Sequence, residues 1–247
     1  LYHNGKLLET TNRGFKAVIQ NNDTKNKTFT VSLVSGVNTL KATAFNNQRT
    51  EGIPDEISVT YKSAETSKPN LYLFVIGINE YKNPKYNLNY AIADATAFRD
   101  EIQKGSSPIF GNINTTFIKD SEATKTRITA DLNKITTLAK QEDMFVFYYA
   151  GHGAMSEEEK SLFYLIPTDV TQMFQATALE QKAISATELK QFSTQIKAQK
   201  QLFILDACQS GGMENVLAAR GAAEEKAIAQ LARSTGTYWL AASNSDQ

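Results

Sequence analysis

Continuous apolar runs constrain the fold of this 247-residue chain more than any other feature of its sequence. They are "LYLFVIGI" (71–78), "MFVFYYA" (144–150) and "KQLFILDAC" (200–208), and each is about as long as a single strand. A strand that is apolar at nearly every position is buried on both faces, which is typical of a parallel sheet covered by helices. Runs of this length are also too short to span a bilayer as helices. The sequence therefore predicts a buried parallel sheet.

Segments with helical periodicity lie between these runs. In residues 87–104 the apolar side chains recur at the spacing of one helix face. The helix predicted over 185–196 opens with Ser185 and Glu188, which have the spacing of a capping box. Strands that alternate with helices indicate an α/β fold with a mostly parallel sheet flanked by helices. The other predicted helices cover 124–141 and 222–232, and the shorter strands cover 115–119, 161–169 and 237–243.

The first 62 residues predict a different structure. Three segments alternate apolar and polar residues as half-buried strands do, and Asn4-Gly5 is a favoured pair for a tight hairpin turn. This spacing predicts a small all-β domain that resembles an immunoglobulin-like sandwich. We divide the chain into this accessory domain with its linker at 1–66 and a second domain at 67–247. The segments are "KTFTVSLV" (27–34), "NTLKATAF" (38–45) and "ISVTYK" (57–62).

Charge and composition exclude several classes of partner. Lys plus Arg and Asp plus Glu number 26 each, so neither nucleic acid nor a membrane surface is expected as a partner. No glycine-rich nucleotide-binding pattern follows a strand. One cysteine and two histidines exclude an internal disulfide and disfavour a Cys/His zinc site. The chain begins at Leu1, which we interpret as a trimmed end; a cytoplasmic location is favoured, with periplasmic or secreted locations as alternatives.

Reactive side chains follow two of the apolar runs. The run 144–150 is followed by Gly151-His152-Gly153, and the run ending at Asp206 is followed by Ala207 and Cys208. Because the carboxyl ends of parallel strands meet at one edge of a sheet, we expect the imidazole and the thiol to lie side by side. The histidine would then either stabilise the thiolate as an ion pair or accept the thiol proton during attack. The N–H groups of Gly153 and Cys208 are candidates for an oxyanion hole.

Each of these residues has a simpler explanation when it is taken alone. A single histidine at a strand end is more often a turn residue. A single cysteine in an apolar segment is more often a small buried side chain. Because both stand at equivalent strand ends and both are followed by glycines, the pair favours catalysis over the two simpler explanations.

"YYAGHG" and "ILDACQSGG" together resemble the caspase-like cysteine peptidases, in particular their prokaryotic metacaspase-like branch. The resemblance extends over residues 71–247 and includes "INEYKN", "LNYAIADA" and "FYLIPTD". Asp206 stands where the caspases proper have Gln, as it does in metacaspases. The resemblance implies a caspase-like fold and a cysteine endopeptidase with a dyad, in which His152 is the general base and Cys208 the nucleophile. No third member of a triad is evident in the sequence.

The resemblance also implies the class of substrate. In metacaspase-like enzymes the carboxylates that match Asp94 and Asp206 line the primary specificity pocket. Two confined carboxylates repel each other, and a basic side chain relieves that repulsion. We therefore expect a protein or peptide substrate that is cleaved after Arg or Lys. The simpler alternatives are a helix-terminal or surface charge for Asp94 and a structural hydrogen-bonding carboxylate for Asp206.

Further expectations concern self-processing, metal binding and the chain end. Arg220, in "AARG", is a candidate site of self-cleavage. Some relatives bind calcium, and Asp169 matches one of their carboxylates, but "VTQMFQATALEQ" replaces the acidic cluster expected after it, so no metal or other cofactor is predicted. The family normally continues with a further helix and strand beyond "AASNSDQ", so we expect this chain to lack the C-terminal part of the domain and to associate with a C-terminal fragment of the same precursor.

Two other functions stay open. One is a caspase-fold peptidase of different specificity, such as a separase-like or gingipain-like enzyme. The other is a catalytically silent caspase-like scaffold. The presence of both His152 and Cys208 favours an enzyme over the scaffold.

Overall fold

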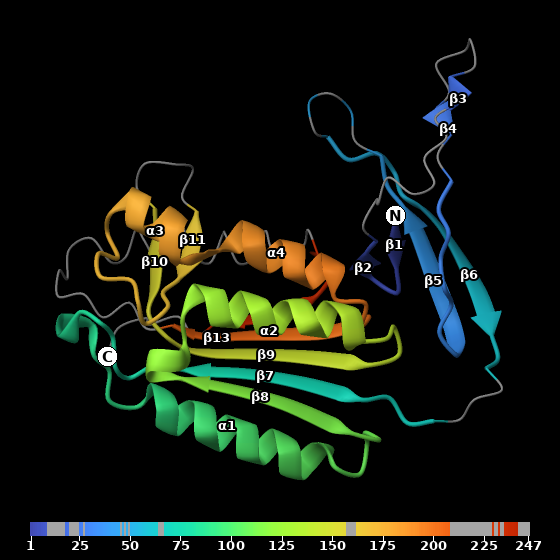
Figure 1. Cartoon of the computed structure of the whole chain (residues 1–247). Coiled ribbons are helices and arrows are strands. Elements are labelled where there is room, and N and C mark those ends of the chain that lie inside the picture. Colours follow the sequence, from blue (N-terminus) through green and yellow to red (C-terminus); the bar gives the residue numbers. More distant parts are fainter. Residues whose placement is uncertain are drawn as a thin grey trace. The chain divides into compact units, whose positions relative to one another are not determined.

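The computed structural model describes residues 1–8, 18–19, 25–26, 28–44, 46, 48, 50–63, 67–156, 162–207, 229, 232 and 235–241. Within the chain, contacts define two compact units, Leu1–Thr66 and Ser67–Gln247. Most of their strands and helices are labelled in Figure 1. In the part of the chain that is described, no helix is long and apolar enough to cross a membrane.

The first unit contains a four-stranded antiparallel sheet in the order β2-β1-β5-β6. Asn4 and Gly5 have φ angles of 51° and 86°, and they form the predicted turn between the first two strands. The short strands β3 and β4 pair with each other. The described residues thus supply an N-terminal antiparallel sheet, and the sandwich stays a prediction. The strands are β1 (Tyr2–His3), β2 (Lys6–Leu7), β3 (Val18–Ile19), β4 (Lys25–Asn26), β5 (Gly36–Ala42) and β6 (Asp55–Tyr61).

The strand predicted over 27–34 is wrong, because residues 28–34 form no strand. The side-chain amide of Asn38 makes the bonds that a neighbouring strand would otherwise make: its Oδ1 accepts from the N–H of Val34 at 2.9 Å, and its Nδ2 donates to the Val34 carbonyl at 2.8 Å. The same Oδ1 lies 2.8 Å from Nε2 of His3, which is fully buried. His3 is therefore a structural residue of this unit.

The second unit is built on a five-stranded sheet in the order β14-β13-β9-β7-β8, and every neighbouring pair in it is parallel. This confirms the predicted parallel sheet. The central strand β9 lies between β7 and β13, and these are the three strands that the apolar runs predict. The strands are β7 (Leu71–Gly77), β8 (Ile113–Lys119), β9 (Met144–Gly151), β13 (Lys200–Ala207) and β14 (Tyr238–Ala241).

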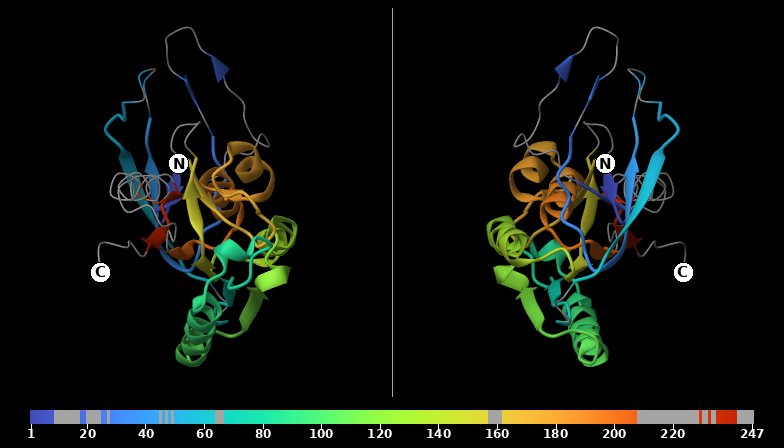
Figure 2. Two further views of the ribbon diagram at one scale, coloured as in Figure 1. Left: turned by 90° about the vertical axis from the view of Figure 1, so that its left-hand side faces the viewer. Right: turned by 90° about the vertical axis from the view of Figure 1, so that its right-hand side faces the viewer.

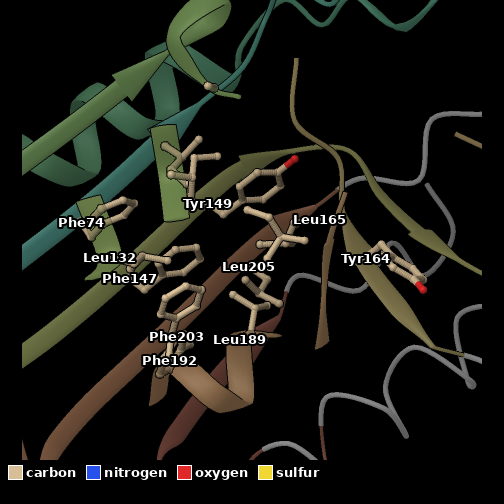
Figure 3. Close-up of a cluster of buried hydrophobic side chains, with 14 of the residues drawn as sticks. Phe74, Leu132, Phe147, Tyr149, Tyr164, Leu165, Leu189, Phe192, Phe203 and Leu205 are labelled. Carbon is tan, nitrogen blue, oxygen red and sulfur yellow. The ribbon is translucent and has the colours of Figure 1, made fainter. Parts of the chain in front are cut away.

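Helices cover both faces of this sheet. Helix α1 (Ala91–Ser106) lies on one face, and α2 (Lys125–Leu138) and α4 (Ala186–Gln195) lie on the other (Figures 1 and 2). Successive residues of a strand point to opposite faces, so a continuous apolar run supplies side chains to two cores at once. One core joins α1 to residues such as Leu73, Val75 and Val146. The other is rich in aromatic side chains and contains Phe74, Phe147, Phe203, Leu132 and Leu189 (Figure 3).

A small antiparallel sheet, in the order β10-β11-β12, was only partly predicted. The single strand predicted over 161–169 is shortened to Phe163–Leu165 in the described residues, and Pro167, which has no N–H to donate, follows it. Strand β10 and helix α3 were not predicted, since both are too short to show a period. The elements are β10 (Gly153–Met155), β11 (Phe163–Leu165), α3 (Ala176–Lys182) and β12 (Ile184–Ser185).

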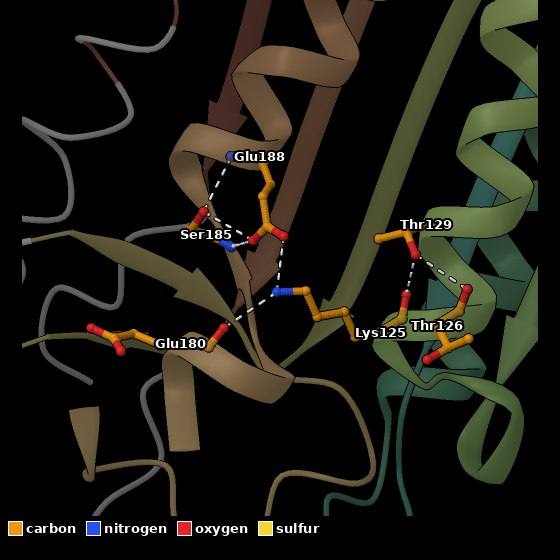
Figure 4. Close-up of polar contacts among 6 residues, drawn as sticks. All are labelled: Lys125, Thr126, Thr129, Glu180, Ser185 and Glu188. Carbon is orange, nitrogen blue, oxygen red and sulfur yellow. Dashed lines mark hydrogen bonds and ion pairs between the residues drawn. The ribbon is translucent and has the colours of Figure 1, made fainter. Parts of the chain in front are cut away.

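Glu188 connects the helices on the aromatic face of the sheet. Its carboxylate accepts from the N–H of Ser185 at 2.8 Å, which completes the capping box predicted for α4. It also forms an ion pair of 2.8 Å with Lys125 of α2 (Figure 4). The ammonium of Lys125 lies 3.5 Å from the carbonyl oxygen of Glu180 in α3. One lysine therefore contacts α3 and α4 from the start of α2.

We expect Glu188→Gln to lower the free energy of unfolding by about 1 kcal/mol at pH 7. Burial alone would raise the pKa of Glu188, but the hydrogen bonds from Lys125 and Ser185 hold it below its ordinary value. A lowered pKa in the folded state stabilises above the unfolded value of about 4.3, and this stabilisation is lost as the pH falls through the folded pKa. Urea unfolding should therefore show a difference from wild type that shrinks between pH 5 and pH 3. Glu180→Gln is the matched control, because only the main chain of Glu180 contacts Lys125. If Glu188→Gln differed from wild type by the same free energy of unfolding at pH 5 and at pH 3, the stabilising role of the Glu188 charge would be contradicted.

Candidate active site

The carboxyl ends of β9 and β13 lie side by side, since Gly151 pairs in register with Ala207. In the sequence His152 directly follows Gly151, and Cys208 directly follows Ala207. His152 is described and is 2% exposed. Cys208 and Arg220 lie outside the described residues. The expected meeting of the two strand ends is observed, and the position of the thiol stays a prediction.

The ring of His152 is oriented by a main-chain oxygen. Its Nε2 lies 2.7 Å from the carbonyl oxygen of Tyr86, which ends the short 3₁₀ helix Pro84–Tyr86. A carbonyl oxygen can only accept a hydrogen bond, so Nε2 carries a proton and donates. In the neutral ring Nδ1 is then the basic nitrogen. The hydrogen bond therefore assigns the role of proton acceptor to Nδ1.

Two buried tyrosines hold the main chain of His152. Its N–H donates to the hydroxyl of Tyr81 at 2.9 Å, and its carbonyl oxygen accepts from the hydroxyl of Tyr149 at 2.8 Å. The Tyr149 hydroxyl also lies 2.9 Å from the carbonyl oxygen of Ile166. Burial raises the pKa of Tyr81 to about 12 and raises that of Tyr149 well above its ordinary value. Both hydroxyl groups stay neutral at physiological pH, so these hydrogen bonds persist.

The glycines on each side of His152 are explained by close packing. A Cβ atom at Gly151 would lie 2.7 Å from the Tyr149 hydroxyl and 2.9 Å from the Tyr81 hydroxyl. A Cβ atom at Gly153 would lie 2.7 Å from Cε2 of Phe163. Any larger residue would displace the side chains that hold the histidine. Gly-His-Gly is therefore required by the packing of this strand end.

The loop after β7 carries both Tyr81 and Tyr86, and it is fixed from two sides. Asp120 begins the 3₁₀ helix Asp120–Glu122 after β8, and its φ of 41° is unusual for a residue with a side chain. Its Oδ1 accepts from the N–H groups of Asn79 and Glu80 at 2.8 and 2.9 Å. The side-chain oxygen of Asn79 in turn accepts from the N–H of Ile92, in the first turn of α1, at 3.2 Å. Sequence reasoning missed this network, because its members are distant in the chain and form no local pattern.

Asp206 and Asp94 lie at the same edge of the sheet and on the same face. Asp206 is in register with Ala150, and Ala150 is in register with Gly77, so the three form a row across three strands. The row faces α1, because a Cβ atom at Gly77 would lie 2.8 Å from Cβ of Ala95. Asp94 stands beside Ala95 in the first turn of α1 and is exposed, while Asp206 is partly exposed. The two positions beside Asp206 in the row, Ala150 and Gly77, are small residues, and the first turn of α1 with Asp94 lies over Gly77.

Tyr148 contacts the carboxylate of Asp206, and this contact was not predicted. Its hydroxyl donates to Oδ2 of Asp206 at 3.0 Å. Its ring stacks on Phe98 of α1, with centroids 4.2 Å apart and planes at 15°. Burial raises the pKa of Tyr148, and the negative charges of Asp206 and Asp94 raise it further. No ion pair with Lys or Arg compensates either carboxylate within the described part of the chain.

The described residues contain no cluster of three or more His, Cys, Asp or Glu side chains suited to a metal ion. Asp169 follows β11, and its Oδ1 is buried without a hydrogen-bond partner in the described structure. The expectation that the protein needs no metal or other cofactor stays a prediction.

A protein-family model described as the Caspase domain matches residues 72–246. No curated protein matches the chain at a significant level. Among solved structures, the crystal structure of protein GSU0716 from Geobacter sulfurreducens aligns with a TM-score of 0.46 at 18% identity. That alignment covers 65% of this chain and only 56% of the other protein. The family match spans most of the chain and includes the parallel sheet, its helices and the strand ends that precede His152 and Cys208. The protein therefore belongs to the caspase-domain family of peptidases.

Proposed function

We propose that this protein is a cysteine endopeptidase that uses a Cys208–His152 dyad and cleaves after Arg or Lys. One observation carries the proposal: His152, with its tautomer set by the Tyr86 carbonyl, follows a strand end that is paired with the strand end preceding Cys208. Cys208 directly follows Ala207, the register partner of Gly151. Consecutive Cα atoms are about 3.8 Å apart, so the main chain keeps Cys208 close to this strand end. Membership of a peptidase family supports the reaction class.

In the proposed mechanism Nδ1 of His152 accepts the proton of the Cys208 thiol, and the sulfur attacks the scissile carbonyl carbon. The negative charge that develops on the carbonyl oxygen is stabilised by the N–H groups of Gly153 and Cys208. Collapse of this intermediate expels the amine, which takes the proton back from His152, and leaves a thioester on Cys208. Water, deprotonated by His152, then hydrolyses the thioester.

The proposed specificity rests on Asp94 and Asp206. Both carboxylates occupy one edge and one face of the sheet, without compensating ion pairs among the described residues. A guanidinium or ammonium group bound between them would remove their mutual repulsion and form charge-assisted hydrogen bonds. A negatively charged side chain would be repelled. This arrangement favours basic residues before the scissile bond.

A panel of fluorogenic peptides that differ only in the residue before the scissile bond tests the proposal. We expect cleavage after Arg and Lys but not after Asp, and no cleavage of any peptide by Cys208→Ala. Preference for the Asp peptide would instead favour a caspase-fold peptidase of different specificity. If the folded wild type neither cleaves any peptide nor reacts with an Arg-directed activity probe, the scaffold alternative gains support.

Self-processing after Arg220 and association with a C-terminal fragment of the same precursor belong to this proposal. An enzyme that cleaves after basic residues is expected to cut "AARG" if that segment reaches its own site. Intact-mass measurement of wild type and Cys208→Ala tests this point. Identical masses for the two proteins would contradict it.

A further inference from the structure

We propose that Tyr148 is a specificity-determining positioning residue, whose hydroxyl holds the Asp206 carboxylate in one orientation and thereby makes the site prefer Arg to Lys. This inference rests on the proposed function. It concerns a residue that touches the recognition carboxylate from within the sheet and that does not itself reach the reacting atoms.

The first argument is geometric. Tyr148 stands two residues before Ala150 on β9, so both side chains point to the same face of the sheet. Asp206 is the neighbour of Ala150 on the adjacent strand. The tyrosine ring therefore lies one step deeper than the row that carries the carboxylate, and its hydroxyl reaches Oδ2 at 3.0 Å. Tyr148 is only 6% exposed, so water competes little for this hydrogen bond.

The second argument is rigidity. The Tyr148 ring stacks on Phe98 and stands in register between Val75 of β7 and Ile204 of β13. A buried tyrosine that stacks on one ring and has a strand neighbour on each side is restricted in the position of its hydroxyl oxygen. The carboxylate that accepts from it is likewise restricted in rotation about its last torsion, which is otherwise soft. Asp206 is thus oriented before any substrate arrives.

The third argument concerns the ligand. Arg presents a planar fork of donors that matches the plane of a carboxylate, whereas the Lys ammonium is a compact charge with little directional demand. A carboxylate of fixed orientation therefore increases the affinity for the planar guanidinium of Arg more than that for the ammonium of Lys. The hydroxyl also remains a donor throughout the working pH range, because burial and the two carboxylates raise the pKa of Tyr148. It orients Asp206 without neutralising its charge.

A purely structural role would have different consequences. Strands β9 and β13 are already paired along their whole length by the backbone ladder. If the hydroxyl served only to join them, its loss would lower stability and leave the choice between Arg and Lys unchanged. The ratio of kcat/KM values for matched Arg and Lys peptides separates the two roles.

The test is Tyr148→Phe in the full chain, which keeps the ring and removes the hydroxyl. We expect KM for the Arg peptide to rise about tenfold, the size of a lost hydrogen bond to a charged group. We expect KM for the Lys peptide to rise less, so that the Arg-to-Lys ratio falls several-fold. The rate of Cys208 alkylation by iodoacetamide should stay at the wild-type value. Tyr72→Phe is the matched control, because Tyr72 stands at the opposite, amino-terminal end of the sheet on β7.

Two further variants keep the inference falsifiable. In an Asp206→Ala background, which has no side-chain acceptor for the hydroxyl, Tyr148→Phe should no longer change the Arg-to-Lys ratio, since the hydroxyl acts through the Asp206 carboxylate. If Tyr148→Phe does not fold, Phe98→Leu removes the stacking ring instead and should shift the ratio in the same direction. If the wild type cleaves both peptides and Tyr148→Phe has the same Arg-to-Lys ratio as the wild type, the inference about Tyr148 is overturned and the proposed function is not. Failure of the wild type to cleave either peptide overturns the proposed function and this inference with it.

Discussion

We expect His152→Ala to lower kcat/KM for an Arg peptide about a thousandfold, which corresponds to about 4 kcal/mol of transition-state stabilisation. In the proposed mechanism, the ring that is removed accepts the thiol proton during attack and returns it to the leaving amine. Its Nε2 donates to the Tyr86 carbonyl, which leaves Nδ1 as the nitrogen that can accept the proton. Steady-state kinetics measures the loss, and alkylation of Cys208 at pH 6 should slow by at least tenfold because the thiolate has lost its partner.

Tyr81→Phe is the graded comparison for this prediction. It removes only the hydroxyl that accepts from the N–H of His152 and leaves the ring and its Tyr86 hydrogen bond in place. We expect a loss of about tenfold, the cost of a buried N–H left without its acceptor. Wild-type kinetics in His152→Ala, with the fold intact by circular dichroism, would exclude His152 as the base. An equal loss in both variants would indicate a structural effect instead of a chemical one.

Asp206→Asn should lower kcat/KM for Arg peptides by a factor of about 100 to 1000, as expected when one partner of a desolvated charge pair is removed. Asparagine keeps the shape of the side chain and an oxygen that accepts from Tyr148, so the change removes charge more than structure. Asp94→Asn should cost less, about tenfold, because Asp94 is exposed and its charge is better screened. The peptide panel measures both effects.

Asp100→Asn is the matched control for the charge. Asp100 lies on the same helix as Asp94 but is exposed and pairs with its neighbour Arg99 at 2.6 Å. It should leave peptide cleavage unchanged, and alkylation of Cys208 should be unchanged in all three variants. If Asp206→Asn cleaved Arg peptides as well as wild type, the pocket assignment would be wrong even though the dyad could still be right.

The residues that were predicted correctly share a local signal. The buried strands β7, β9 and β13 appear as continuous apolar runs, and the capping box of α4 has its two members three residues apart. The meeting of the two strand ends follows from the rule that parallel strands share a carboxyl edge. In these cases the physical cause acts within one element or between equivalent strand ends, so a linear pattern records it.

The residues that were missed act across long separations. The Tyr86 carbonyl orients His152 through a main-chain atom that every residue type has, so no side chain marks it. Asp120 fixes the loop after β7 from the end of another strand. Alternation over 27–34 predicts a strand, but residues 28–34 form none, and at Val34 the main chain bonds to the Asn38 amide instead of to another strand. The pattern of apolar and polar residues does not specify which group forms a hydrogen bond with a given main-chain atom.

By itself, the sequence determined the parallel α/β sheet, the family resemblance that the domain match supports, and the candidate pair His152 and Cys208, because strand burial and residue order are local properties. Only the tertiary structure decided which nitrogen of His152 is basic, why glycines flank it, and that Tyr148 lies beneath the row from Gly77 to Asp206. These depend on contacts between groups tens of residues apart, whose distances are set by how strands and loops pack. Short sequence segments therefore indicate the type of chemistry, whereas the orientation of the side chains involved depends on the folded sheet.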